Sequence, residues 1–138
     1  YGDESARSLI IEGTEGDATL RSLMNWNQID TSATTKEVLN HWQKLGRFRR
    51  DHPAVGAGTH QMISEQPYYF KRSFEKGDYT DTVIIGVGVP KGEKSIEVSQ
   101  TFENGEMLHD SYSGISAEVK NGKVLIASEF DIVLLEKK

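Results

Sequence analysis

The sequence predicts a mainly β protein, in which an antiparallel sandwich follows a loop segment and one α-helix. Two observations support this fold class. Residues 34–51 carry apolar side chains at helical spacing, and from residue 59 onward short apolar runs alternate with turn residues. About eight such runs in succession are typical of an antiparallel, Greek-key-like sandwich or of a barrel.

Length and composition limit the classes of protein to consider. The 138 residues, 36% of them apolar, suit one compact domain with room for a second, partial unit. A formal net charge of -5 argues against a dedicated nucleic-acid binder, which normally has a clustered basic excess. No apolar run reaches the roughly 18 residues of a membrane span. The absence of cysteine excludes disulfides and thiolate metal sites, and leaves extracellular, periplasmic and cytoplasmic locations open.

The helix has recognisable start and stop signals. Thr34 and Glu37 have the spacing of a capping box, so the helix is expected to begin at Thr34 or Thr35. It is expected to end at Asp51, because the residue before Pro53 avoids the α region. Residues 1–33 are expected to form a loop, since glycine, asparagine and aspartate interrupt any long period. One apolar face of the helix consists of Val38, Leu39, Trp42 and Leu45.

The remainder of the chain predicts strands and tight turns. The expected strands are His60–Glu65, Tyr68–Phe74, Thr82–Val89, Ser95–Phe102, Met107–Tyr112, Ser116–Lys120, Lys123–Ser128 and Ile132–Glu136. Asn104-Gly105 and Asn121-Gly122 lie between strand-like runs, and both residue types tolerate the positive φ of a type I′ turn. Each pair therefore predicts a hairpin. Gly86 and Gly88 are expected to allow close packing of the sheet.

Each candidate residue, taken alone, is weak evidence for a functional site. Asp3 and Glu4 are adjacent carboxylates, and glycoside hydrolysis uses two carboxylates. Neighbouring strand residues point to opposite faces, however, so an ordinary loop or strand end is the simpler interpretation. No pair of histidines has metal-binding spacing, so no metal site is predicted, and His52 is expected to cap the helix end.

An aromatic run is the second candidate. Exposed rings of Tyr68 and Tyr69 are candidates for stacking on a glucan, as binding surfaces often use aromatic side chains. Strand alternation puts Tyr69 on the face opposite Tyr68 and Phe70, so packing in the core is the competing interpretation.

In their order along the chain, these motifs resemble the C-terminal part of the α-amylase family of glycoside hydrolases, family 13. Tyr1-Gly2-Asp3-Glu4 resembles the end of the eighth barrel strand, and Arg21-Ser22-Leu23-Met24-Asn25-Trp26 resembles the following loop. Val38 to Val55 resembles the eighth barrel helix with its terminal Arg-x-x-His-Pro-Ala. Asp110-Ser111-Tyr112-Ser113-Gly114 and the closing Ile132-Val133-Leu134-Leu135-Glu136 are similar to the C-terminal β-domain. Leu23 stands where the family usually has proline.

The resemblance implies that residues 1–58 are the last segment of a (β/α)8 barrel and residues 59–138 a C-terminal β-sandwich. The parent protein would cleave or transfer α-glucosidic bonds with retention, through a carboxylate nucleophile and a carboxylic acid. Both would lie upstream, so no catalytic residue is expected in this chain. No cofactor is expected here, and a calcium requirement of the parent stays open. The residues that the resemblance places at the rim of the substrate site are Tyr1, Asp3, Glu4, Arg21, Met24 and Trp26.

The expected partners are the parent's α-glucan substrate, starch or maltooligosaccharides, and the parent's own barrel. Two alternatives remain open: a non-catalytic glucan-binding module that uses surface tyrosines such as Tyr68, Tyr69, Tyr79 or Tyr112, and a degenerate, non-hydrolytic relative. The helix face defined above should have evolved to pack on the barrel. We therefore expect it to be exposed, covered by residues 1–33, or buried in self-association.

Overall fold

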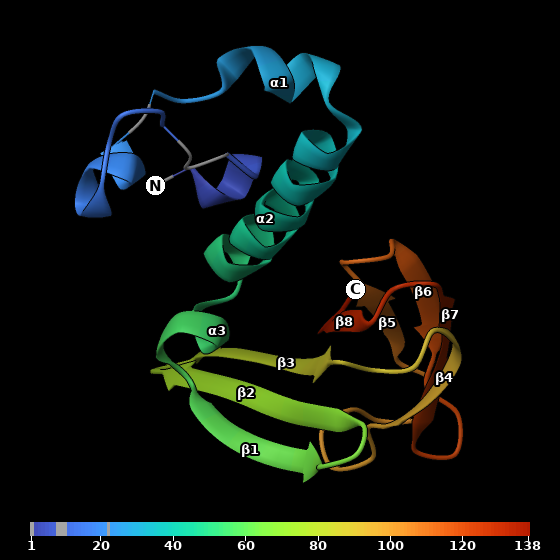
Figure 1. The fold of residues 1–138 in the computed structure, drawn as a ribbon. Coiled ribbons are helices and arrows are strands. Elements are labelled where there is room, and N and C mark those ends of the chain that lie inside the picture. Colours follow the sequence, from blue (N-terminus) through green and yellow to red (C-terminus); the bar gives the residue numbers. More distant parts are fainter. Residues whose placement is uncertain (1, 8–10, 22) are drawn as a thin grey trace. The chain divides into compact units, whose positions relative to one another are not determined.

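The computed structural model describes residues 2–7, 11–21 and 23–138, and it divides the chain into two compact units, Tyr1–Gly46 and Arg47–Lys138 (Figure 1). The helical elements are η1 (Asp3–Ser5), η2 (Gly16–Arg21), α1 (Trp26–Thr31), α2 (Ala33–Asp51) and α3 (Pro53–Ala57). The strands are β1 (Thr59–Ser64), β2 (Tyr68–Lys76), β3 (Tyr79–Val87), β4 (Gly92–Glu97), β5 (Met107–Asp110), β6 (Ile115–Glu118), β7 (Lys123–Ser128) and β8 (Ile132–Lys137). The two units meet within α2, and the boundary expected between residues 58 and 59 stays a prediction.

The first unit contains more helix than the sequence predicted. The segment expected as a loop holds the short helix α1 and two 3-10 turns. Helix α2 starts at Ala33, and its first turn is capped by Ser32, whose Oγ accepts a hydrogen bond from the Thr35 backbone nitrogen at 3.3 Å. The predicted cap at Thr34 is therefore wrong, because the helix begins earlier and Ser32 supplies the oxygen.

The end of α2 follows the prediction. The helix stops at Asp51, and Pro53 opens α3, where a residue without an amide hydrogen loses no helical bond. On the apolar face of α2, Trp42 is 49% exposed. Val38, Leu39 and Leu45 are half-buried.

The second unit contains two antiparallel sheets, and the mainly β prediction is confirmed (Figure 1). The six-stranded sheet has the order β1-β2-β3-β8-β5-β6, and the two-stranded sheet pairs β4 with β7. Strand β8 therefore lies between β3 and β5, where Leu135 is opposite Ile84 on one side and Asp110 on the other.

One of the two predicted hairpins is present. Lys120 and Lys123 exchange both backbone hydrogen bonds, at 2.8 and 3.0 Å, around Asn121 and Gly122, whose φ angles are 52° and 74°. Asn104-Gly105 does not connect a hairpin, and that prediction is wrong: β4 before it pairs with β7, and β5 after it pairs with β6 and β8.

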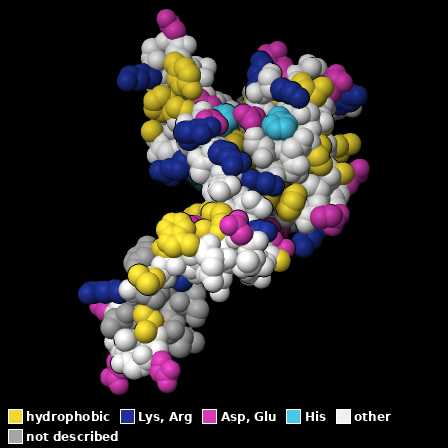
Figure 2. Space-filling model, turned by 90° about the horizontal axis from the view of Figure 1, so that it is seen from above, with side chains coloured by type: hydrophobic (Ala, Val, Ile, Leu, Met, Phe, Trp, Pro, Cys, Tyr) yellow, Lys and Arg dark blue, Asp and Glu magenta, His cyan; other side chains and the backbone are white. Residues whose placement is uncertain are grey.

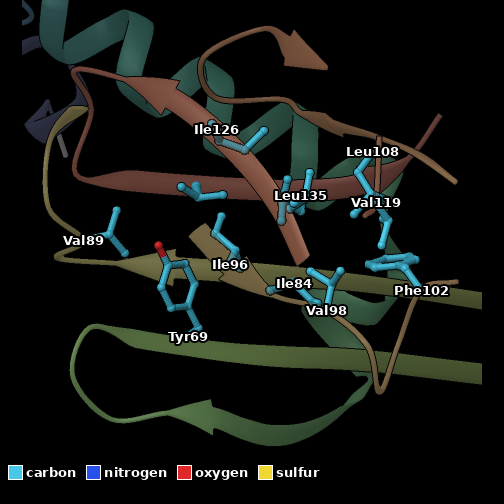
Figure 3. Packing of buried hydrophobic residues seen from close by; sticks show 12 residues of the cluster. Tyr69, Ile84, Val89, Ile96, Val98, Phe102, Leu108, Val119, Ile126 and Leu135 are labelled. Atoms are coloured by element: carbon cyan, nitrogen blue, oxygen red, sulfur yellow. The ribbon is translucent and has the colours of Figure 1, made fainter. Parts of the chain in front are cut away.

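The core of the second unit lies between the two sheets (Figure 3). Strand alternation supplies it, since Val124 and Ile126 of β7 are buried while Leu125 between them is 54% exposed. Burying each such aliphatic side chain is worth about 1.5–3 kcal/mol. The cluster consists of Tyr69, Ile84, Val89, Ile96, Val98, Phe102, Leu108, Val119, Val124, Ile126, Val133 and Leu135.

Of the two glycines expected to allow close packing, only Gly86 does so. A Cβ atom at Gly86 would lie 2.5 Å from Cε1 of Tyr69 and 2.9 Å from Cγ1 of Val89. A Cβ atom at Gly88 would meet no other part of the chain within 4 Å, and its φ of +65° is the reason for glycine at this position.

Among the described residues, no helix combines the length and the apolar character needed to cross a bilayer. On the face drawn in Figure 2, basic and acidic side chains are interspersed, with hydrophobic side chains scattered between them.

Candidate functional sites

The predicted rim residues fall in the first unit. Asp3 and Glu4 are exposed within η1, and the Glu4 carboxylate accepts a hydrogen bond from the Gly2 nitrogen at 3.1 Å. Arg21 is exposed at the end of η2. Tyr1 lies outside the described residues.

A pair of polar residues brings two rim segments together. The Ser5 hydroxyl donates to Oδ1 of Asn25 at 2.7 Å, and Nδ2 of Asn25 donates to the Ser5 carbonyl at 3.0 Å. Met24 and Trp26 flank Asn25; Met24 is half-buried and Trp26 is 69% exposed. The segments that carry Asp3 and Trp26 are therefore joined, although they are distant in sequence.

The turn that holds Asp3 and Glu4 requires glycine before it. Gly2 has a φ of +91°, and a Cβ atom there would lie 2.5 Å from Nε of Arg7. Arg7 is 8% exposed, so its side chain has little room to withdraw. The glycine of the Tyr-Gly-Asp-Glu motif is thus explained by conformation and by close packing.

The second unit contains a histidine between two carboxylates. Nδ1 of His52 is 2.8 Å from Oδ1 of Asp81, and Nε2 of His52 is 2.8 Å from Oε2 of Glu136. The three side chains are 12%, 9% and 26% exposed, respectively. The ring centroid of Phe48 lies 4.5 Å from that of His52. The imidazole therefore joins the strands to the end of α2. The backbone nitrogen of His52 donates to the Phe48 carbonyl at 3.0 Å, in keeping with the expected position at the end of α2.

Further contacts extend this junction to α3. The second Asp81 oxygen accepts a hydrogen bond from the Ala54 nitrogen at 2.9 Å, and Nε of Arg72 donates to the Ala54 carbonyl at 3.0 Å. Ser111 donates its hydroxyl hydrogen to Glu136. The carboxylates are thus held in place from both sides.

This arrangement suits a structural contact between the end of α2 and the sheet better than it suits catalysis. Both ring nitrogens of His52 face carboxylate oxygens, so neither is available to a substrate. The ring also fills the space between Asp81 and Glu136, so the two carboxylates cannot flank a glycosidic bond. Across the part of the chain that the structure describes, no group of three or more histidine, aspartate or glutamate side chains is arranged to hold a metal ion.

A second carboxylate, Asp110, is fully buried at the end of β5. Its Oδ1 accepts hydrogen bonds from the backbone nitrogens of Leu134 at 2.8 Å and Tyr112 at 3.1 Å, and its Oδ2 accepts one from the Ser113 hydroxyl. The Asp-Ser-Tyr-Ser-Gly motif is therefore a turn closed by its own aspartate.

The two tyrosines proposed for glucan stacking lie on opposite faces of β2, as alternation requires. Tyr69 is 6% exposed and its ring lies among Val89 and Ile96 (Figure 3). Burial, with a smaller effect of the nearby Asp110 charge, raises the pKa of Tyr69 to about 12. A ring buried in this way has no free face for a sugar.

Tyr68 belongs to a partly exposed group that we call the aromatic face, defined by His60, Met62, Tyr68, Phe70 and Val87. Cross-strand pairs place these side chains on one side of β1, β2 and β3. The Tyr68 hydroxyl is 3.0 Å from Nε2 of His60, whose ring stacks on Phe70 at 4.7 Å between centroids. Met62 and Val87 are 57% and 50% exposed.

Sequence comparison finds one informative relative. This chain is 41% identical over 86 residues to the periplasmic alpha-amylase of Escherichia coli (strain K12). The aligned region covers 62% of this chain and 12% of that protein. No protein-family profile matches the chain. The chain thus spans about an eighth of the length of that relative, as the 12% coverage shows.

Comparison with solved structures also finds similarity to an alpha-amylase. A crystal structure of an Anoxybacillus alpha-amylase matches with a TM-score of 0.64 and 26% identity, covering 100% of this chain and 28% of that one. AmyP bound to maltose matches with a TM-score of 0.61 and 16% identity over 98% of this chain and 30% of that one. A variant of AmyP bound to maltotriose matches with a TM-score of 0.64, 18% identity and the same coverages, 98% and 30%. The resemblance predicted from the motifs is confirmed: the chain corresponds to a short part of α-amylase-type proteins, and its β unit is similar to their C-terminal domain.

Proposed function

We propose that this chain is the C-terminal part of an α-amylase-type glycoside hydrolase that acts on α-glucans by a retaining, two-carboxylate mechanism. In this proposal the segment is non-catalytic and supports the barrel of the parent protein. The observation that carries the proposal is the 41% identity over 86 residues to an alpha-amylase, of which this chain spans 12%. Relatives of similar fold that were solved with maltose and maltotriose support a glucan as the parent's substrate.

The geometry of the carboxylates supports a non-catalytic role. Asp81 and Glu136 are brought together by the fold, but His52 occupies the space between them. Asp3 and Glu4 lie in one short exposed turn, and Glu4 binds the backbone of its own turn. Neither pair has a sugar-sized gap between two opposed carboxyl groups, which the reaction needs.

Asp3, Glu4, Arg21, Met24 and Trp26 are proposed to shape the rim of the parent's substrate site, as the resemblance implies. The Ser5–Asn25 contact supports this proposal, because it holds two of the rim segments together. The half-exposed apolar face of α2 around Trp42 is proposed to pack on the barrel, and self-association through this face is the alternative.

Activity of the purified chain tests the non-catalytic role. We expect no release of reducing sugar from soluble starch, because the acid and the nucleophile lie in the upstream barrel. Measured hydrolysis that survives further purification would contradict this part of the proposal.

The gene sequence upstream of Tyr1 tests the identity of the parent. A barrel with aspartate on its fourth strand, glutamate on its fifth and aspartate on its seventh is expected. A barrel that lacks these three groups would favour the degenerate, non-hydrolytic relative.

A glucan-binding module is the second candidate, and the aromatic face is the observation that favours it. Retention of the chain on insoluble starch, lost in Tyr68→Ala, would support it. Tyr79, which is 51% exposed and lies at the opposite end of the β2–β3 pair, is a further surface tyrosine to replace by alanine in the same test.

A further inference from the structure

The two Asn-Gly pairs singled out above lie next to each other in the second unit. Oδ1 of Asn104 accepts a hydrogen bond from the backbone nitrogen of Gly122 at 2.8 Å, across 18 residues of sequence. Asn104 and Asn121 are both exposed. Asparagine is a thermolabile residue, and a following glycine offers the least steric hindrance to its deamidation.

The chemistry of deamidation makes this contact significant. The backbone nitrogen of the following glycine attacks Cγ of the asparagine, a new N–Cγ bond forms, and the Cγ–Nδ2 bond breaks. Ammonia leaves with the proton of the attacking amide. Water then opens the cyclic imide at one of its two carbonyl carbons, giving aspartate or isoaspartate. At Asn121 the attacking atom would be the Gly122 nitrogen, whose hydrogen is donated to Asn104.

We propose that Asn121 is a latent site of intramolecular deamidation and that Asn104 limits its rate. The hydrogen bond from Gly122 to Asn104 must break before the nitrogen can lose its proton and turn toward Asn121. The Gly122 carbonyl is held as well, since it accepts a hydrogen bond from the Val98 nitrogen at 2.8 Å. The attacking residue is therefore held at both its nitrogen and its carbonyl oxygen.

Asn104 is protected by a similar arrangement. The nitrogen that would attack it, that of Gly105, donates to the Val119 carbonyl at 2.9 Å. The Asn104 side chain is itself held by Gly122. Local opening of one turn therefore releases groups that restrain the other, so the two asparagines are coupled.

Deamidation of Asn121 would alter the surface around this residue. Asn121 lines a shallow pocket of about 590 Å³ together with Lys120, Lys123 and the exposed Leu125. Aspartate at this position adds a negative charge beside two lysines. Isoaspartate lengthens the main chain between Lys120 and Lys123, which exchange two hydrogen bonds around the turn.

Peptide mass spectrometry of the intact chain, aged in mildly alkaline buffer, tests the proposal. Asn104→Ala removes the acceptor, and Asn104→Asp keeps an acceptor oxygen; both variants also remove the first Asn-Gly pair. We expect Asn121 to deamidate about fivefold faster in Asn104→Ala than in the unchanged chain, the factor that corresponds to one neutral hydrogen bond. In Asn104→Asp the rate should be no higher than that of the unchanged chain, because a carboxylate oxygen is at least as strong an acceptor as an amide oxygen.

Equal rates in all three folded proteins would overturn the proposal, and so would a rate in Asn104→Asp as high as in Asn104→Ala. Near-ultraviolet circular dichroism checks that each variant is folded. Should Asn104→Ala fail to fold, amide hydrogen exchange at Gly122 replaces the comparison. Protection in the unchanged chain and in Asn104→Asp is expected, and an unprotected Gly122 amide would overturn the proposal.

Discussion

His52 and Asp81 lie 29 residues apart in sequence, and Nδ1 of the histidine is 2.8 Å from Oδ1 of the aspartate. The other ring nitrogen is equally close, at 2.8 Å, to Glu136, which lies 84 residues along the chain. One imidazole thereby joins the end of α2 to two strands of the six-stranded sheet. This contact is the basis of the first prediction.

Removal of the imidazole should strongly destabilise the second unit. His52→Ala removes the side-chain partner that Asp81 and Glu136 share and the ring that packs on Phe48, and we expect a loss of about 2–4 kcal/mol in the free energy of unfolding. Urea denaturation followed by fluorescence measures this. Arg50→Ala is the control, because the Arg50–Asp51 pair is exposed and no measurable change is expected. Equal effects of the two substitutions would contradict the assigned role of His52.

Asp110 should be replaceable by asparagine but not by alanine. Its Oδ1 accepts two backbone hydrogen bonds, which asparagine preserves, while the new amide can donate to the Ser113 hydroxyl. Alanine leaves the Tyr112 and Leu134 nitrogens without their acceptor, at a cost of about 2–4 kcal/mol. Thermal unfolding of both variants tests this, and a similar loss of stability in each would refute the hydrogen-bond explanation.

Tyr69 should make the stability of the second unit fall in alkaline solution. Its folded pKa is raised from 10.0 to about 12, so between these values the folded state binds a proton that the unfolded state has lost. This contribution is fully present below about pH 10 and is lost as the pH rises through about 12. Unfolding free energy measured against pH should show the loss, and Tyr69→Phe should reduce it; burial raises the pKa of Tyr112 as well, so part of the alkaline loss should remain. A Tyr69→Phe variant with an unchanged alkaline slope would show that other groups are responsible.

Two glycines should respond oppositely to alanine. At Gly86 a Cβ would press on the Tyr69 ring at 2.5 Å, so Gly86→Ala should cost about 1–3 kcal/mol. A Cβ atom at Gly46, within α2, would meet nothing within 4 Å apart from the helix's own backbone, so Gly46→Ala should stabilise the helix by up to about 1 kcal/mol. Denaturation midpoints of the two variants give the comparison, and a shift in the same direction for both would be inconsistent with this packing.

Elements with local signals could be predicted from the sequence. The helix expected at 34–51 is α2, and the strand expected at Lys123–Ser128 is β7 with the same bounds. Both depend on periodicity within one segment. The turn at Asn121-Gly122 was also predicted, because positive φ at two successive residues has a local chemical preference.

Pairing and long-range contacts could not be predicted in this way. Asn104-Gly105 has the same residue types as the true hairpin turn, but only Gly105 has a positive φ. The Asn121-Gly122 turn is closed by the bridge between Lys120 and Lys123, whereas Gly105 donates its backbone hydrogen bond to the distant Val119 carbonyl. The partners of His52 have no signal near it in sequence. The contact between Ser5 and Asn25 likewise has no local signal in the sequence, because it forms only in the folded first unit.

The position of β8 has a consequence for how the second unit folds. This strand is the last of the eight in sequence, yet it joins β3 to β5 in the middle of the six-stranded sheet. Until Ile132–Lys137 is available, β3 and β5 each present an unpaired edge, and such edges promote aggregation. Contacts of such long sequence separation also slow folding. A chain interrupted before Ile132 should therefore aggregate through the unpaired edges of β3 and β5. Pairing of β8 with these two strands is then the step that limits how fast the whole β unit folds.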